Sequence, residues 1–372
     1  MNRRSLIEVL GFVVLVHAIA YYGNGLLTSP LRSGWDLVLT AEAPPLARFD
    51  AAAYRSIAQS GYAWNPATGV GTVAFFPLYP LLMKMLAFSG LPLFWAGTVI
   101  SHAAFLVSAF LLQKVEAMPP RPGPAQSSLL ALLTFPWAFF LIAPYSESLF
   151  LALALAVFLH ALHGRWALVA LFGFLAGLTR IFGLALVLPL LVLAWRPNPR
   201  PAGALPEPRW PAVVAALAPA MGLAAFVAWL AFRFSDPLLF LHAQQRGWGR
   251  SPGWSGLQSS LQAIVGNIRQ HGWLHLGPAV DLLVVLLLIA SVVHALRSQK
   301  PTSAAYVGSG FVLVAASGSL LSSGRFALVL FPVFGFLAIL ARRPAAWYAY
   351  LLFSSVLQAY LIVRFVNNLW VA

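Results

Sequence analysis

Long apolar runs, separated by short polar or basic segments, fill almost the whole of this sequence. Of the 372 residues, 60% are hydrophobic and only 9% are charged, whereas a soluble domain needs roughly 25% charged residues to cover its surface. The mean hydropathy of +0.83 agrees with this deficit of charge. Most of the surface must therefore face lipid, and the sequence predicts an all-α polytopic membrane protein.

The charged residues and the missing cysteines exclude several functional classes. Without cysteine, the chain has no disulfide framework, thiolate metal site or cysteine nucleophile. The net charge is +14, but the basic residues are scattered between apolar runs, so nucleic acid is not an expected partner. Cytoplasmic loops, which collect Lys and Arg, explain the charge better. Twenty of the 23 basic residues are arginine, which suits phosphates, lipid head groups and carboxylates, although codon bias in a GC-rich genome would also produce the excess.

The apolar runs also predict a topology. With the short basic loops in the cytoplasm, we expect eleven crossings, a cytoplasmic N-terminus and an uncleaved first helix, although the N-terminal run also resembles a secretory signal. Residues 73–90 then form a re-entrant or interfacial segment. We expect one transmembrane domain over 1–372, with outer loops at 23–72 and 233–277. The expected crossings are 6–22, 91–113, 129–143, 146–163, 166–179, 182–195, 211–232, 278–297, 302–321, 327–341 and 345–362.

This topology assigns charged residues to one or the other side of the membrane. Five of the nine acids are expected outside, and ionisable groups gathered at outer helix ends predict a site at the outer membrane surface. Those acids are Asp36, Glu42, Asp50, Glu147 and Asp236. The basic residues expected in the cytoplasm are Arg3, Arg4, Lys114, Arg121, Arg165, Arg196, Arg200, Arg209, Arg297, Lys300, Arg342 and Arg343.

Asp50 stands in the most informative outer segment, Arg48–Tyr62. A helix over residues 49–59 would place Asp50 at its beginning, directed towards an open cleft. An Asp at that position is also a common helix cap, because its carboxylate accepts backbone N–H bonds. Spacing alone favours the cap over a catalytic role.

Further outer patches have both functional and structural interpretations. The aromatic and proline cluster at 74–82 could hold an isoprenoid chain or a sugar, or form an interfacial aromatic belt. Glu147 could bind a substrate hydroxyl or interact with a helix dipole. Arg180 and Arg325 could hold a phosphate, or pair with the acids in a salt-bridge network. Residues 235–250 mix Gln, Trp and Arg, which suit sugar recognition, but they also fit an amphipathic helix on the membrane surface.

The sequence predicts neither a metal nor a cofactor. The sequence contains no Glu-x-x-His pair, and a histidine-based metal site is not expected. The chain also has no Walker, Rossmann or Gly-x-Ser-x-Gly motif.

Five of these patches, taken in order, resemble one family. They are Phe-Asp-Ala-x-x-Tyr-x-x-Ile-Ala-x-x-Gly-Tyr, Ala-Phe-Phe-Pro-Leu-Tyr-Pro-Leu, Pro-Tyr-Ser-Glu-Ser-Leu-Phe, Leu-Thr-Arg-x-x-Gly and Gly-Arg-Phe-Ala-Leu-x-x-Phe-Pro, over residues 48–332. Together they resemble the PIG-V mannosyltransferases of GPI-anchor assembly and their bacterial relatives, in the GT-C superfamily. The family commonly has Trp before the catalytic acid, where this chain has Phe49. The composition is closer to a bacterial relative, for which no GPI acceptor exists.

The resemblance implies a metal-independent, inverting glycosyltransferase that uses a polyprenyl-phosphate sugar donor, with Asp50 as its catalytic residue. The chemistry agrees, because an inverting transfer needs one carboxylate as base and cations on the leaving phosphate. We assign Asp50 as base, Arg180 and Arg325 as phosphate ligands, and Glu147, Tyr145 and Gln245 as groups that position the sugar or acceptor. Further candidate substrate-binding residues are Arg48, Tyr54, Arg55, Tyr79 and Arg246.

Mannose is the expected sugar, and a glycolipid or cell-envelope glycan the expected acceptor, at the outer face of the cell membrane and in contact with membrane lipid. Two rival functions stay open. One is a flippase or transporter of lipid-linked sugars, which would need no base but would need a path through the protein. The other is a polysaccharide polymerase or ligase, which would share the side of the membrane and the lipid carrier.

Overall fold

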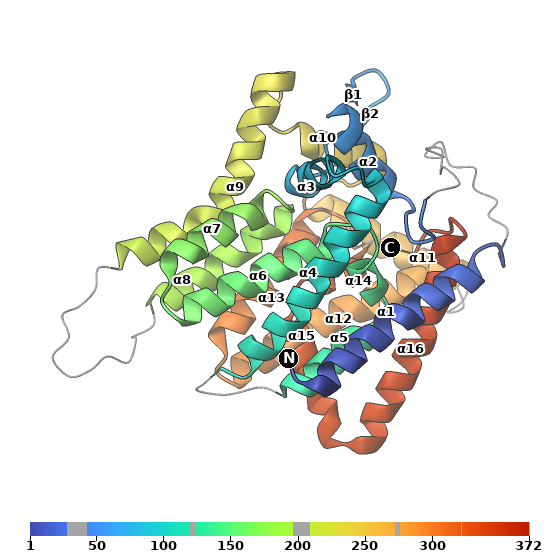
Figure 1. Cartoon of the computed structure of the whole chain (residues 1–372), viewed down its shortest axis with the longest axis vertical. Coiled ribbons are helices and arrows are strands. Elements are labelled where there is room, and N and C mark those ends of the chain that lie inside the picture. The colour runs from blue at the N-terminus through green and yellow to red at the C-terminus, as the bar shows by residue number, and fades with distance from the viewer. Residues whose placement is uncertain (28–42, 119–123, 196–208, 272–275, 321, 372) are drawn as a thin grey trace.

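The structure, a computed structural model, describes residues 1–27, 43–118, 124–195, 209–271, 276–320 and 322–371 (Figure 1). Asp36 and Glu42 of the first outer loop lie outside these ranges, as do Arg121, Arg196 and Arg200 of the basic loops.

The described chain is almost entirely helical, which confirms the all-α prediction. A hairpin of two antiparallel strands, β1 (Trp64–Asn65) and β2 (Val70–Gly71), is the one sheet within it. The α-helices are α1 (Arg3–Gly23), α2 (Asp50–Ser60), α3 (Leu78–Ala87), α4 (Leu93–Glu116), α5 (Ala125–Thr134), α6 (Glu147–Leu162), α7 (Trp166–Gly177), α8 (Val187–Trp195), α9 (Trp210–Phe234), α10 (Leu239–Trp248), α11 (Trp254–His271), α12 (Leu276–Arg297), α13 (Pro301–Ala316), α14 (Ser323–Ala327), α15 (Pro332–Leu337) and α16 (Pro344–Val366). Three 3₁₀ helices, η1 (Ala138–Leu141), η2 (Ile181–Leu186) and η3 (Ala338–Arg342), join some of them.

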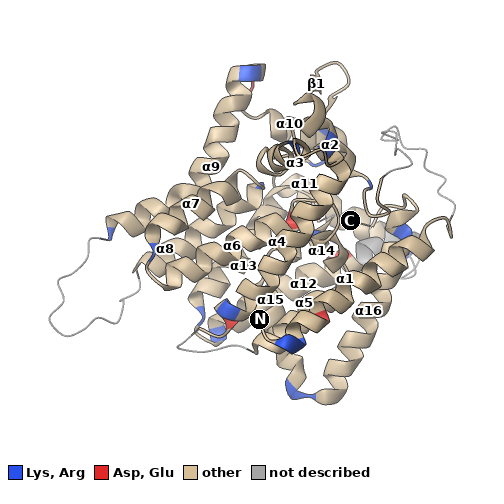
Figure 2. Cartoon of the chain, in the orientation of Figure 1, with Lys and Arg blue, Asp and Glu red and all other residues tan. Residues whose placement is uncertain are grey.

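Five helices of the described chain are long and apolar enough to cross a membrane: α1, α4, α9, α16 and residues Val280–Arg297 of α12. Their outward faces carry large apolar side chains. Val14 of α1 is 68% exposed and Leu352 of α16 is 69% exposed, which would be costly in water but is normal against lipid tails. These helices fit a membrane protein, and Figure 2 shows Lys and Arg mainly at helix ends and in loops.

Several expected crossings are shorter or broken helices. Stretch 129–143 is not one helix, because α5 ends at Thr134 and Pro136 disfavours helical backbone in the residue before it. Stretch 182–195 begins as η2 before it continues as α8, and stretch 327–341 is divided between α15 and η3. At 1.5 Å per residue, the ten residues of α5 extend only about 15 Å, half the thickness of the hydrocarbon core.

Helix α6 is buried on almost every side. It packs against α4, α7 and α8, and Phe150, Leu151, Ala154, Leu155 and Val157 are all buried. A helix that is apolar all round belongs in a core rather than at a surface. Its first residue, Glu147, is therefore carried into the interior of the protein, where it needs cationic partners.

Helices α7 and α9 approach each other closely through glycine. A Cβ added at Gly177 would lie 2.0 Å from the carbonyl oxygen of Pro219, and one at Gly222 would lie 2.1 Å from that of Phe174. Only glycine permits such contact between helix backbones, as is common in membrane proteins. The contact fixes the end of α7, from which the chain leads directly to Arg180.

Candidate functional site

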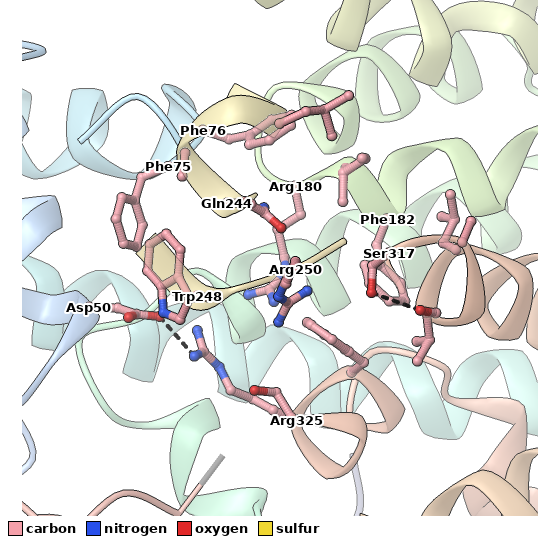
Figure 3. Close-up of a pocket in the computed structure, with 18 of the residues that line it drawn as sticks. Asp50, Phe75, Phe76, Arg180, Phe182, Gln244, Trp248, Arg250, Ser317 and Arg325 are labelled. Carbon is pink, nitrogen blue, oxygen red and sulfur yellow. Dashed lines mark hydrogen bonds and ion pairs between the residues drawn. The ribbon is translucent and has the colours of Figure 1, made fainter. Parts of the chain in front are cut away.

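A cavity of about 350 Å³ opens between segments that are far apart in the sequence (Figure 3). We call it the arginine cavity, because three arginines and one carboxylate line it. Figure 3 shows Asp50, Arg180, Arg250 and Arg325 pointing into it from separate segments. The lining residues are Asp50, Tyr54, Ala74, Phe75, Phe76, Thr179, Arg180, Ile181, Phe182, Leu241, Gln244, Trp248, Arg250, Pro252, Leu313, Val314, Ala316, Ser317, Ser322, Arg325, Phe326 and Trp370.

Asp50 is the first residue of α2, and its carboxylate does not cap the helix. The cap position is Phe49, which makes no side-chain cap bond. The Asp50 carboxylate instead forms an ion pair, with Oδ2 2.8 Å from a terminal nitrogen of Arg325. The cap interpretation, which spacing alone favoured, is therefore wrong. Asp50 also lines the cavity, so its carboxylate is open to a ligand there.

The backbone before Asp50 is strained. Phe49 has φ 48° and ψ −114°, in the left-handed region that a residue with a Cβ rarely adopts. Its ring packs between Phe365 and Trp370, with ring centroids 5.4 and 5.6 Å away. The backbone N–H of Asp50 donates to the hydroxyl of Tyr145 at 3.2 Å. Packing on one side and this bond on the other hold the carboxylate in place.

Glu147 lies behind the cavity wall and joins two of the arginines. Its side chain is fully buried, with Oε1 2.7 Å from a terminal nitrogen of Arg180 and in contact with Nε of Arg325. The same nitrogen of Arg180 also donates to Oγ of Ser146 at 3.1 Å. Asp50, Arg325, Glu147 and Arg180 thus form one continuous chain of charges. This is the salt-bridge network that the sequence left open, and it joins α2, α6, α14 and the segment after α7.

Two further contacts position Arg325. A Cβ at Gly324 would lie 2.3 Å from the ring of Trp137, so only glycine allows α14 to approach this closely. The carboxylate of Asp281, on α12, lies close to the backbone of residues 322–324. Burial acts against the charge of Arg325, but the carboxylates of Glu147 and Asp50 outweigh it and raise the pKa of the guanidinium. Arg325 is consequently a permanent cation.

Buried tyrosines form a scaffold beneath the charged groups. The hydroxyl of Tyr145 donates to the carbonyl of Arg48 at 2.8 Å. The centroid of its ring lies 4.7 Å from the guanidinium carbon of Arg325. Tyr54 shares a hydrogen bond of 2.8 Å with Ser146. Tyr79 donates to the carbonyl of Gly97 and packs against Tyr54, with ring centroids 4.9 Å apart. Of these three, only Tyr54 lines the cavity.

Arg250 is the cation that sequence analysis did not select. It lies over the ring of Phe326, 5.3 Å from the centroid, and no carboxylate of a described residue forms an ion pair with it. Burial and the nearby guanidinium of Arg325 lower the pKa of Arg250 to about 10. The cavity therefore carries an excess positive charge that a bound anion would neutralise.

Helix α10 contributes a different face from the one expected. Gln244 and Trp248 line the cavity together with Leu241, whereas the predicted Gln245 and Arg246 are exposed. Arg246 instead donates to the carbonyl of Pro66 at 2.9 Å, beside the β-hairpin. The spacing i, i+3, i+7 of the three lining residues is that of one helix face, and this signal in the sequence could have identified them.

Other predicted site residues lie away from the cavity. Arg48 is buried and donates to the carbonyl of Val366 at 3.0 Å. This bond connects the segment before α2 with the end of α16. The guanidinium of Arg55 lies 5.3 Å from the ring centroid of Phe94. Glu147, Tyr145 and Gln245, which we expected to position the sugar or acceptor, do not line the cavity either. The first two support residues that do.

The arrangement can bind an anion and remove a proton. One carboxylate and three guanidinium groups meet in a cavity with aromatic walls, so a phosphate and an adjacent hydroxyl can be held together. Among the described residues, no group of three or more His, Asp or Glu side chains could hold a metal ion. The arginines would neutralise negative charge on a ligand bound in this cavity.

Comparison of the sequence with models of protein families and with curated proteins found no match to either. The functional conclusion therefore depends on the site itself.

Proposed function

We propose that the protein is an inverting glycosyltransferase that moves a mannosyl or related sugar from a polyprenyl-phosphate donor to a lipid-linked or cell-envelope acceptor. One observation carries the proposal: Asp50 and three arginines converge on one cavity, and one of those arginines, Arg250, lacks a carboxylate partner among the described residues. A base beside an excess of cations is what transfer from a phosphate leaving group requires.

In the proposed step, the acceptor hydroxyl attacks the anomeric carbon of the donor sugar. Its proton goes to Oδ1 of Asp50, the new glycosidic C–O bond forms, and the bond from the anomeric carbon to the phosphate oxygen breaks. The bonding pair leaves on the phosphate, so the products are the glycoside with inverted configuration and the polyprenyl phosphate. Asp50 later releases its proton to solvent.

The leaving phosphate gains negative charge as its bond to the sugar breaks. Arg180 and Arg325 share Glu147, yet each retains N–H groups beyond those that contact carboxylates. We assign Arg250 as a further phosphate ligand, because its charge is otherwise not neutralised. The cost of holding these cations together is met before the donor arrives, so their stabilisation of the developing charge needs no reorganisation.

The remaining walls suit a sugar on a lipid carrier. Trp248 and Phe75 offer aromatic faces, which stack on the C–H groups of sugars, and Gln244 offers an amide for hydroxyl groups. We propose that the isoprenoid chain enters from the bilayer between helices. In this proposal the bundle is GT-C-like, with about eleven crossings, a cytoplasmic N-terminus, and Asp50 on the extracytoplasmic side of the cell membrane.

A transporter of lipid-linked sugars has less support. The described residues also line a second large cavity, but it shares no residue with the arginine cavity. Tyr306, which stands on α13 between the residues that line the two cavities, is buried. A transport path would have to connect both ends of the bundle.

The test is Asp50→Asn. Asn keeps the size and a hydrogen-bond acceptor for Arg325, but it cannot take a proton, so a base would be lost at a typical factor of 10²–10⁴ in rate. Membranes with wild-type or variant protein would receive labelled polyprenyl-phosphate mannose, and lipids and polysaccharides would then be analysed. Asp236→Asn is the matched control, because Asp236 is paired with His242 outside the cavity. Normal transfer by a well-folded Asp50→Asn protein would refute the proposed role.

A further inference from the structure

The second cavity lies at the other end of α13. It measures about 960 Å³, and Thr302 and Ser303, at the start of α13, form part of its wall. The end of the same helix, at Leu313 and Val314, lines the arginine cavity instead. Ten residues of helix separate these positions by about 15 Å. The second cavity is therefore a separate site that the proposed transfer does not use.

Positive charge predominates in this cavity. Lys300 and Arg342 both line it, and both lie within electrostatic range of His294, another lining residue. Neither forms an ion pair with a carboxylate of a described residue. The acid in the described wall is Glu116, so two cations face one carboxylate. A bound anion would neutralise the remaining positive charge.

The beginning of α13 offers hydrogen-bond donors at the same place. The helix starts at Pro301, and its cap residue, Lys300, makes no side-chain cap bond. The first N–H groups of a helix have no partner within it, and they carry partial positive charge. The hydroxyl of Thr302 is buried and has no hydrogen-bond partner among the described residues. A buried polar atom of this kind indicates a missing water or ligand.

We propose that the second cavity binds a phosphate group, held by Lys300, Arg342 and the start of α13. Helix N-termini and basic side chains are the groups that bind phosphates in proteins. The phosphate belongs to the head group of an anionic lipid or to a soluble ion. Phe336 and Ile339 in the wall, with Val293 exposed on the outer face of α12, provide an apolar surface for acyl chains. The inference is independent of the proposed transferase activity.

The test measures thermal melting of the purified protein in detergent with phosphatidylglycerol, phosphatidylcholine or inorganic phosphate, and native mass spectrometry of the bound species. We expect phosphatidylglycerol to raise the melting temperature more than phosphatidylcholine does. Lys300→Ala and Arg342→Ala should each weaken this binding about 10-fold or more, the usual effect of losing a charged hydrogen bond. Thr302→Val should weaken it roughly 2- to 10-fold.

Arg343→Ala is the control, because Arg343 is the neighbouring basic residue but does not line the cavity. Stabilisation by inorganic phosphate that both alanine variants lose would assign the site to a soluble phosphate. Equal binding of phosphatidylglycerol by the wild type and a folded Lys300→Ala, Arg342→Ala double variant would overturn the proposal. Absence of binding by every probe would overturn it as well.

Discussion

Replacing Arg250 by glutamine should stabilise the empty protein while it impairs use of the donor. In the folded chain the pKa of Arg250 falls from 12.5 to about 10, because burial and the cation of Arg325 disfavour its charged form. A shift of this size corresponds to roughly 3 kcal/mol against the cation. Since the side chain keeps some contact with solvent, we expect about 1–2 kcal/mol of this to be recovered in the variant.

The gain should raise the melting temperature in detergent by a few degrees, on the order of 2–4 °C per kcal/mol. The cost of the charge is fully present below pH 10, the pKa in the folded protein, and declines as the pH rises above that value. The difference in melting temperature between variant and wild type should therefore stay constant between pH 6 and 9, and shrink above pH 10. Differential scanning fluorimetry over this range would measure it.

Sugar transfer by the Arg250→Gln variant should decrease, although its stability should increase. Loss of a charged hydrogen bond to the donor phosphate costs roughly 1.5–3 kcal/mol, so kcat/KM for the donor should fall about 10- to 150-fold. Arg246→Gln is the matched control, because Arg246 is an arginine of the same helix region that lies outside the cavity. Lower stability of Arg250→Gln would show that Arg250 has a structural role, and an unchanged kcat/KM would show that it does not bind the donor.

Three further outcomes follow from the structure. Glu147→Gln should destabilise the protein by about 3–5 kcal/mol, measured by thermal melting, because it leaves buried arginine charge without its partner; a melting temperature like that of the wild type would refute this. Gly177→Ala should lower stability and transfer together, because the added Cβ would lie 2.0 Å from the Pro219 oxygen and displace the segment that carries Arg180; normal kinetics in this variant would separate that contact from the site. In this cysteine-free chain, a single cysteine at position 203 should resist an impermeant thiol reagent in intact cells while one at Thr68 reacts, and labelling of position 203 would overturn the expected topology.

The sequence located the charged residues better than it predicted their roles. Asp50, Glu147, Arg180 and Arg325 do come together, although the chain separates the first from the last by hundreds of residues. Spacing could not show that Glu147 would lie behind the wall, because its burial arises from how α6 packs among its neighbours. Arg250 was missed since it follows α10, where nothing local indicates which way the chain turns.

Local sequence was also an incomplete guide to the helices. Hydropathy identified α1, α4, α9 and α16 nearly to their ends, since each presents an apolar face along its full length. It could not tell that stretch 129–143 is broken, because a buried apolar segment has the same composition whether it is one helix or two. The proline at 136 was the local signal for the break.

The distribution of the cavity-lining residues from Asp50 to Trp370 has a consequence for biosynthesis. At about 5–20 residues per second, the ribosome needs roughly 15–60 s between the first and the last of them. During insertion, Glu147 enters the interior before Arg180 follows it, and Arg325 arrives much later. A buried acid without a cation is costly, so the burial of Glu147 is compensated only once Arg180 and Arg325 are both in place. The finished cavity forms only after nearly the entire chain has been made, because its lining extends to Trp370.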